Sequence, residues 1–222
     1  MPWSSMESAI AAFQRGEFVM VMDSADREDE CDLVIAAERI TPEQMAFCIR
    51  RSTGIICIAT DKERLEHFGL HPATKRNTDV NETNFYVSTD FLPGTLTGVS
   101  AADRAATARA LCDLSNRSED FSKPGHLFPL CARLGGVLER PGHTESTFDM
   151  CRLSGCIPVG VLAELMHDDG TMFRQGDSLA FAEEHKLEIV TVTQIIEYRR
   201  KLEAEGKPFP VVQAPPAARA RL

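Results

Sequence analysis

Blocks of apolar residues separated by polar segments run along the chain, and they predict helices interspersed with strands. Short, fully apolar runs bounded by charged or turn residues are typical of buried strands. They predict strands at residues 18–22, 33–37, 55–59, 85–88, 127–130, 137–138, 159–165 and 188–191. Longer stretches with helical periodicity and capping residues predict helices at residues 4–15, 41–52, 61–68, 100–114, 144–153, 179–185 and 192–204.

The order of these elements is irregular, and some strands are joined by short loops. This pattern favours an α/β fold of the α+β type, in which a mixed β-sheet core is covered by helices. Nothing resembling a linker divides the chain, so we expect a single compact domain over residues 1–205 and a partly disordered tail over 206–222. The polar segments 71–83, 91–98 and 116–124 are predicted to be loops.

Composition excludes several classes of function. The 222 residues carry a net charge of −9, whereas a nucleic-acid partner requires a basic face. No apolar stretch reaches the roughly 18 residues of a membrane span, and no secretory leader is apparent. The seven cysteines form no Cys-x-x-Cys pair, which favours reduced thiols in the cytoplasm over disulfides.

The densest charge lies between two predicted strands, at residues 26–32. Five acids and Arg27 occupy six of these seven positions, and Cys31 occupies the seventh. Like charges at this density repel one another unless something offsets them, and a hard divalent cation is the usual counter-charge. A solvated acidic loop is the alternative, because charge runs commonly face water. A binding role therefore needs supporting residues elsewhere in the chain.

Two histidines in glycine-rich segments are candidates for that support. His126 follows Gly125, and His143 follows Gly142. Arg140, Thr144 and a predicted helix N-terminus at Thr144 would together form a phosphate cradle. A histidine at its mouth could be a metal ligand or a proton shuttle, and a purely structural role is the alternative.

Glu164 lies in an otherwise apolar run at residues 159–165. A buried carboxylate there is costly unless it is paired, ligated or protonated. Strand alternation could instead direct it to solvent. If it is buried, a raised pKa would suit acid–base work near neutral pH.

Six motifs in one order together resemble a known enzyme family. They are Asp-Arg-Glu-Asp-Glu-x-Asp at 26–32, Thr-Gly-Val-Ser-Ala-x-Asp-Arg at 97–104, Pro-Gly-His-x-Phe-Pro-Leu at 124–130, Gly-Gly-Val-Leu-x-Arg at 135–140, Gly-His-Thr-Glu at 142–145 and Gly-Val-Leu-x-Glu at 160–164. The chain resembles the 3,4-dihydroxy-2-butanone 4-phosphate synthases over roughly residues 5–198. The resemblance implies a lyase of riboflavin biosynthesis that converts D-ribulose 5-phosphate to L-3,4-dihydroxy-2-butanone 4-phosphate and formate.

The resemblance also implies a divalent cation, Mg²⁺ or Mn²⁺, with two ions per site when substrate is bound, and a homodimer. By position, Glu28 and His143 match metal ligands. The residues that match catalytic positions are His126, Glu164, Asp23, Glu30 and Cys57. Those that match substrate contacts are Arg27, Glu28, Asp32, Thr97, Arg140, Pro141, Gly142, His143, Thr144 and Glu164. The polar segment 71–83 matches a flexible lid.

Cys31 occupies a position that is more often glycine in this family. It lies between Glu30 and Asp32, whose charges should raise the pKa of the thiol unless a metal offsets them. Two interpretations of Cys31 stay open: a site of redox modification, and a small residue that the position tolerates. Two other functions also stay open for the whole chain: another metal-dependent phosphosugar isomerase or aldolase, and a non-catalytic sugar-phosphate-binding protein.

Overall fold

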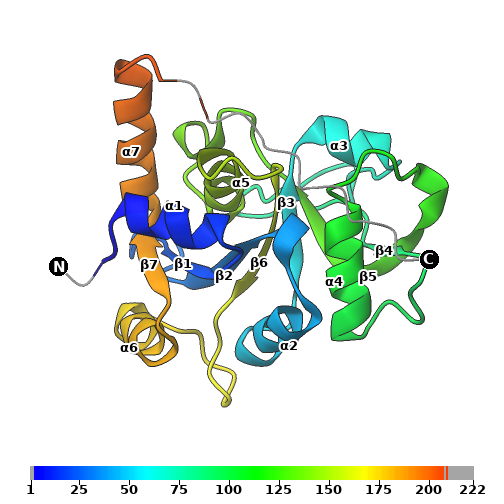
Figure 1. The fold of residues 1–222 in the computed structure, drawn as a ribbon, viewed down its shortest axis with the longest axis horizontal. Helices are drawn as coiled ribbons and strands as arrows, with labels where there is room; N and C mark the ends of the chain where they lie inside the picture. The colour runs from blue at the N-terminus through cyan, green and yellow to red at the C-terminus, as the bar shows by residue number, and fades with distance from the viewer. Residues whose placement is uncertain (1–2, 208, 210–222) are drawn as a thin grey trace.

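The computed structural model describes residues 3–207 and 209, so the predicted tail lies almost entirely outside the described residues. In the described part, seven strands form one mixed sheet in the order β4-β5-β3-β6-β2-β1-β7 (Figure 1). The strands are β1 (Val19–Met22), β2 (Cys31–Ala36), β3 (Cys57–Thr60), β4 (Thr89–Phe91), β5 (Phe121–Cys131), β6 (Val159–Glu164) and β7 (Glu188–Thr191). The predicted fold class is thereby confirmed.

Helices cover both faces of the sheet (Figure 1). One face packs against α1 (Met6–Gln14), α5 (His143–Leu153) and α7 (Val192–Ala204). The other packs against α2 (Pro42–Arg51), α4 (Ala101–Ala110) and α6 (Gln175–His185), and the short α3 (Lys62–His67) joins the same core. Because side chains alternate along each strand, the two faces form two separate cores. None of the described helices is long and apolar enough to cross a membrane.

Local signals account for most of the helix starts. Thr41 and Gln44 form the predicted capping box, with Pro42 in the first turn of α2. Ser5 caps α1, and Ser100 caps α4. The start of α5 differs from the prediction, because Gly142 is the capping residue and Thr144 lies inside the first turn. The prediction was wrong there because a glycine with extended backbone can replace a hydroxyl cap.

Three predicted segments differ from the structure. Within residues 85–88, Phe85 and Tyr86 form isolated bridges only, and the regular strand β4 begins at Thr89. Part of the predicted loop 116–124 belongs to β5, which starts at Phe121 because β4 pairs with it. Residues 137–138 lie in a 3₁₀ turn (Gly136–Leu138) under α5 and α7 rather than in a strand. All three are short segments whose conformation depends on tertiary partners.

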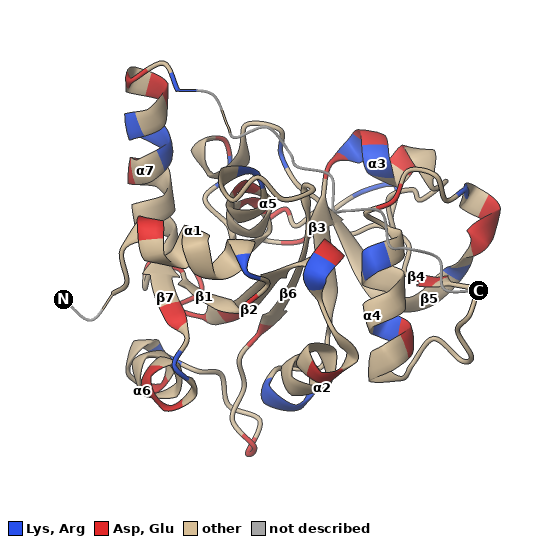
Figure 2. Cartoon of the chain, in the orientation of Figure 1, with Lys and Arg blue, Asp and Glu red and all other residues tan. Residues whose placement is uncertain are grey.

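Acidic and basic residues are mixed over the outer helices. Figure 2 shows Lys and Arg beside Asp and Glu on α2, α3, α4 and α7. The expectation of no nucleic-acid partner stays a prediction that is compatible with this distribution.

Helix α5 lies unusually close to the central strand β6. A Cβ atom at Gly160 would meet Thr147 Cγ2 at 2.4 Å and Cys151 Sγ at 3.1 Å. The glycine therefore sets the height of α5 above the sheet, and with it the position of the helix N-terminus.

We expect Gly160→Ala to lower the free energy of unfolding by about 1–3 kcal/mol, because the added methyl overpacks the contact between β6 and α5. Gly176→Ala is the matched control, since nothing lies within 4 Å of that Cβ position and the residue is helical. Alanine is the better helix former, so this control should be neutral or slightly stabilising. Urea unfolding measures both, and equal stabilities would contradict the prediction.

Candidate active site

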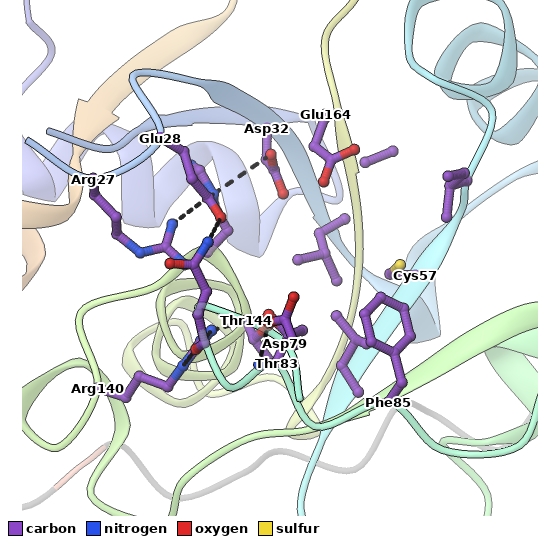
Figure 3. Close-up of a pocket in the computed structure, with 16 residues that line it drawn as sticks. Arg27, Glu28, Asp32, Cys57, Asp79, Thr83, Phe85, Arg140, Thr144 and Glu164 are labelled. Carbon is purple, nitrogen blue, oxygen red and sulfur yellow. Dashed lines mark hydrogen bonds and ion pairs between the residues drawn. The ribbon is translucent and has the colours of Figure 1, made fainter. Parts of the chain in front are cut away.

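Three predicted site residues meet at one end of the central strands, on the face covered by α5. Asp32 on β2 pairs directly with Glu164 on antiparallel β6, so their side chains are neighbours on one face. Cys57 opens β3, which runs antiparallel to β6, and so lies at the same end. Figure 3 shows Asp32, Glu164 and Cys57 around one cavity.

The acidic segment is a tight loop between β1 and β2, and Asp23 holds it together. Asp23 Oδ1 accepts the Glu30 N–H at 2.9 Å, while Oδ2 accepts from Glu28 N–H at 3.2 Å and Arg27 Nη1 at 2.8 Å. Arg27 also pairs with the Glu28 carboxylate. Arg174, at the start of α6, donates to the carbonyl oxygens of residues 28 and 29. The loop is thus a built structure rather than a solvated charge run.

The N-terminus of α5 supplies an anion-binding element. The first N–H groups of a helix have no partner inside the helix, and its dipole favours negative charge there. Arg140 lies beside this terminus, where the buried Glu145 accepts from its Nη1 at 2.6 Å. A Cβ atom at Gly142 would lie 2.4 Å from Arg140 Nη1, so glycine allows this close approach. Arg140, His143 and Thr144 all line the cavity.

The predicted lid segment closes the cavity through Asn81. Its side-chain amide donates to Glu28 Oε1 at 2.5 Å, and its carbonyl oxygen accepts from Arg140 Nε at 3.1 Å and Nη2 at 2.9 Å. Asn81 thereby bridges a predicted metal ligand and a predicted substrate contact. With the segment in place the cavity measures about 190 Å³, which is below the roughly 300–1,000 Å³ of many ligand sites.

The buried charges influence one another strongly. Burial raises the pKa of Asp32 to about 7, and the neighbouring carboxylates add to this shift while His143 opposes it. Burial disfavours the charge on His143, but Asp32 and Glu28 outweigh it and raise the pKa of His143 to about 9. His143 in turn holds the pKa of Glu28 below its usual range. At neutral pH the cluster retains protons that a bound cation would displace.

The donor set suits a hard divalent cation. Asp23, Glu28 and His143 each place one ligand atom within 4.8 Å of the others. Asp32 Oδ1 and His143 Nε2 are buried without a hydrogen-bond partner among the described residues, so each needs a counterpart in the loaded site. Two carboxylates with space for water or substrate oxygens match the preference of Mg²⁺. The imidazole is the less usual ligand in this set.

Six of the predicted site residues do not line this cavity, although all six are described. Two of them, Asp23 and Gly142, belong to the acidic loop and to the start of α5. His126 and Thr97 lie in the region of β4 and β5, with exposed side chains. Pro141 is exposed beside the cradle, and Glu30 is half-buried at the end of the acidic loop. Burial, together with the charges of Glu164 and Glu28, raises the pKa of Glu30.

The two cysteines near the acidic cluster lie on opposite faces of the sheet. Cys57 borders the cavity, and burial, together with the Glu164 and Asp32 charges, raises the pKa of its thiol. It is therefore a neutral thiol rather than an activated nucleophile. Cys31 points to the other face, with 0% exposure, against Ser178 of α6. Its pKa is raised chiefly by burial and only then by charges, so the small-residue interpretation is favoured over a modification site.

Comparison with known proteins identifies the family. The model of 3,4-dihydroxy-2-butanone 4-phosphate synthase matches residues 7–198. The chain therefore belongs to this family. An Agrobacterium fabrum protein of that name is 47% identical over 89% of this chain and 93% of its own length. The Aquifex aeolicus riboflavin biosynthesis protein RibBA is also 47% identical, and the chain spans 50% of it.

Solved structures agree with this assignment. A 3,4-dihydroxy-2-butanone 4-phosphate synthase in complex with two magnesium ions superposes with a TM-score of 0.88 at 39% identity, covering 90% of this chain and 99% of that one. A Candida albicans synthase superposes with a TM-score of 0.82 at 41% identity, covering 89% and 98%. The predicted family, fold class and activity are thus confirmed: the chain is a lyase of riboflavin biosynthesis.

Sequence reasoning missed the residues that position the others, namely Asn81, Glu145 and Arg174. Glu145 lies in the quoted Gly-His-Thr-Glu motif, five residues after Arg140, and this proximity was an available signal. Asn81 and Arg174 gave no such signal, because their partners are distant in the sequence.

We expect Asn81→Ala to release the lid segment. A hydrogen bond to a charged group contributes about 1.5–3 kcal/mol, so the population of the open form should rise by about ten-fold or more. Trypsin cleavage after the exposed Lys75 or Arg76 should accelerate by that factor. Asn116→Ala is the control, since Asn116 donates to Ala110 O outside the lid. Unchanged cleavage in Asn81→Ala would show that this contact does not hold the segment.

Proposed function

We propose that the cavity binds D-ribulose 5-phosphate with its phosphate at the N-terminus of α5 and its reacting carbons near Glu164. One observation carries this proposal: the proposed cation ligands, the helix end suited to an anion, the buried Asp32 and the half-buried Glu164 all line a single cavity. Arg140 and Thr144 would hold the phosphate, since guanidinium and N–H groups suit its oxygens. Arg27 and Asp32 would contact the sugar hydroxyls.

We propose that Glu28 and His143 hold a magnesium ion, with Asp23 beside them as a further oxygen donor. A second ion would bind with the substrate and use substrate oxygens as additional ligands. The same would hold for Mn²⁺ in place of Mg²⁺. The cation would stabilise the negative charge that develops on neighbouring substrate oxygens. Asp23 accepts three hydrogen bonds from its own loop, so we assign it first to holding Glu28 in place.

Proton transfers are proposed for the groups that face the substrate. Enediol formation, loss of water and migration of the carbon skeleton each need a base or an acid close to the sugar. Among the described residues, the Glu164 side chain accepts one hydrogen bond, from Thr53 Oγ1 at 3.4 Å, and it borders the cavity. Cys57 would contribute a neutral thiol against the sugar. We assign Glu30, whose charge interacts with that of Glu164, a supporting role in these transfers.

We propose that the enzyme is a homodimer in which His126 and Thr97 of one subunit complete the cavity of the other. Both residues are expected to act on substrate, yet neither lines the cavity of its own chain. Large apolar side chains are exposed in the same region: Ile55 at 50%, Phe85 at 39%, Leu96 at 94% and Val99 at 48%. Exposed apolar side chains gathered near functional residues are typical of an interface.

We also propose a cytoplasmic location. The seven cysteines are all buried and unpaired, as is usual for proteins kept in a reducing compartment.

Formate release from D-ribulose 5-phosphate tests the function. We expect Mg²⁺-dependent formate, abolished by EDTA and restored by added Mg²⁺. Glu164→Gln should lower kcat by about 10²-fold or more, while binding of substrate is retained. Conversion to another pentose phosphate without formate would indicate an isomerase, and binding without turnover a non-catalytic protein. Either result would overturn the proposal.

Mixing two inactive variants tests the shared site. In a hybrid of Glu164→Gln and His126→Ser subunits, one of the two cavities keeps both residues if each cavity draws His126 from its partner. Random exchange should then restore about a quarter of wild-type activity, because half of the dimers are hybrids with one intact site. The unmixed variants are the controls. If Glu164 and His126 act within one chain, mixing restores nothing.

A further inference from the structure

His126 is held by a carboxylate that no motif identified. Asp90, on β4, accepts the backbone N–H of His126 through Oδ1 at 2.8 Å. Its other oxygen, Oδ2, lies 2.6 Å from the ring nitrogen Nδ1 of His126. Asp90 is 6% exposed, whereas the His126 side chain is 48% exposed. The carboxylate is thus buried behind the ring, and the ring faces outward.

Two motif glycines enclose this carboxylate. A Cβ atom at Gly98 would lie 2.1 Å from Asp90 Oδ2, and one at Gly125 would lie 2.2 Å from the backbone carbonyl carbon of Thr89. Gly98 has a φ of 81°, in the left-handed region that favours glycine, and its N–H is held by Asp103 Oδ2 at 3.1 Å. These glycines let the segments that carry Thr97 and His126 approach the Asp90 backbone and side chain.

The two contacts determine which ring nitrogen of His126 carries the proton. An ionised carboxylate can only accept hydrogen bonds, so Nδ1 must be the protonated nitrogen of the neutral ring. Nε2 is then a free lone pair on the exposed edge, ready to take a proton from a substrate carbon or hydroxyl. A carboxylate behind a histidine also stabilises the imidazolium that forms after this transfer.

We propose that Asp90 is a positioning residue that keeps His126 in the Nδ1–H tautomer, with Nε2 directed at the cavity of the partner subunit. The proton taken by Nε2 in one step is returned from Nε2 in a later one, and Asp90 remains ionised throughout. This role of Asp90 rests on the proposed catalytic role of His126, although the tautomer itself does not.

The test uses Asp90→Asn, which preserves the size of the side chain. The oxygen of the new amide must face the backbone N–H of His126, so the NH₂ group of the amide faces the ring nitrogen Nδ1. Nδ1 must then accept a hydrogen bond, and the ring proton moves to Nε2. In ¹⁵N-detected imidazole spectra, we expect the neutral His126 ring to be Nδ1–H in the wild type and Nε2–H in Asp90→Asn. The His126→Ser spectrum assigns the signal. An Nε2–H ring in the wild type overturns the proposal even if the variant does not fold.

Turnover distinguishes positioning from a general structural effect. We expect Asp90→Asn to lower kcat for formate release about 10²-fold or more, with KM changed less than about three-fold. The double variant with His126→Ser should be no slower than His126→Ser alone, because both changes remove one function. Asp169→Asn, in an exposed turn, is the control and should leave kcat unchanged.

The outcomes separate the two proposals. If Asp90→Asn moves the proton to Nε2 but His126→Ser keeps the wild-type kcat, the catalytic role of His126 is wrong and the positioning contact stands. If Asp90→Asn leaves the tautomer and kcat at wild-type values, the positioning role is wrong. Independent, additive losses in the double variant would also overturn it.

Discussion

The pairing of β2 with β6 is the constraint on which the site depends. Asp32 faces Glu164 across this antiparallel pair, and both side chains point toward α5. A register slip of one residue would exchange Asp32 for Cys31 at the cavity and move the carboxylate to the opposite core. The cost of an unpaired carboxylate in that apolar core opposes the slip, whereas the fully buried Leu33, Val34 and Ile35 would be apolar side chains in an apolar core on either face.

This register brings several carboxylates close together, and the repulsion between their charges must be offset. Asp32 and Glu28 approach His143, while Arg27 bridges Asp23 and Glu28. The raised pKa values of Asp32 and His143 show that this compensation is incomplete in the protein alone. The proposed divalent cation between these groups would complete it, which would relate the electrostatics of the resting site to the proposed metal dependence.

Features with local signals could be predicted from the sequence, and features that depend on distant partners could not. The capping box at Thr41 was predictable because its partners lie within one helical turn. Phe121–Pro124 are strand residues only because they pair with β4, and Cys31 has acidic neighbours in sequence but an apolar core around it. The site divides in the same way. The predicted metal ligands Glu28 and His143 could be recognised from their residue types and motifs. Asn81 and Asp90 could not, because they contact partners 36 to 59 positions away.

The motif glycines show how the ligands and the residues behind them are connected. Gly98, Gly125, Gly142 and Gly160 each occupy a point where a Cβ atom would lie within 2.4 Å of another group. They bring β4 to the His126 segment, an arginine to the helix end, and α5 to the sheet. The motifs therefore specify close approach of the backbone as much as chemistry. A catalytic side chain is useful only when the segment behind it can come near enough to hold it.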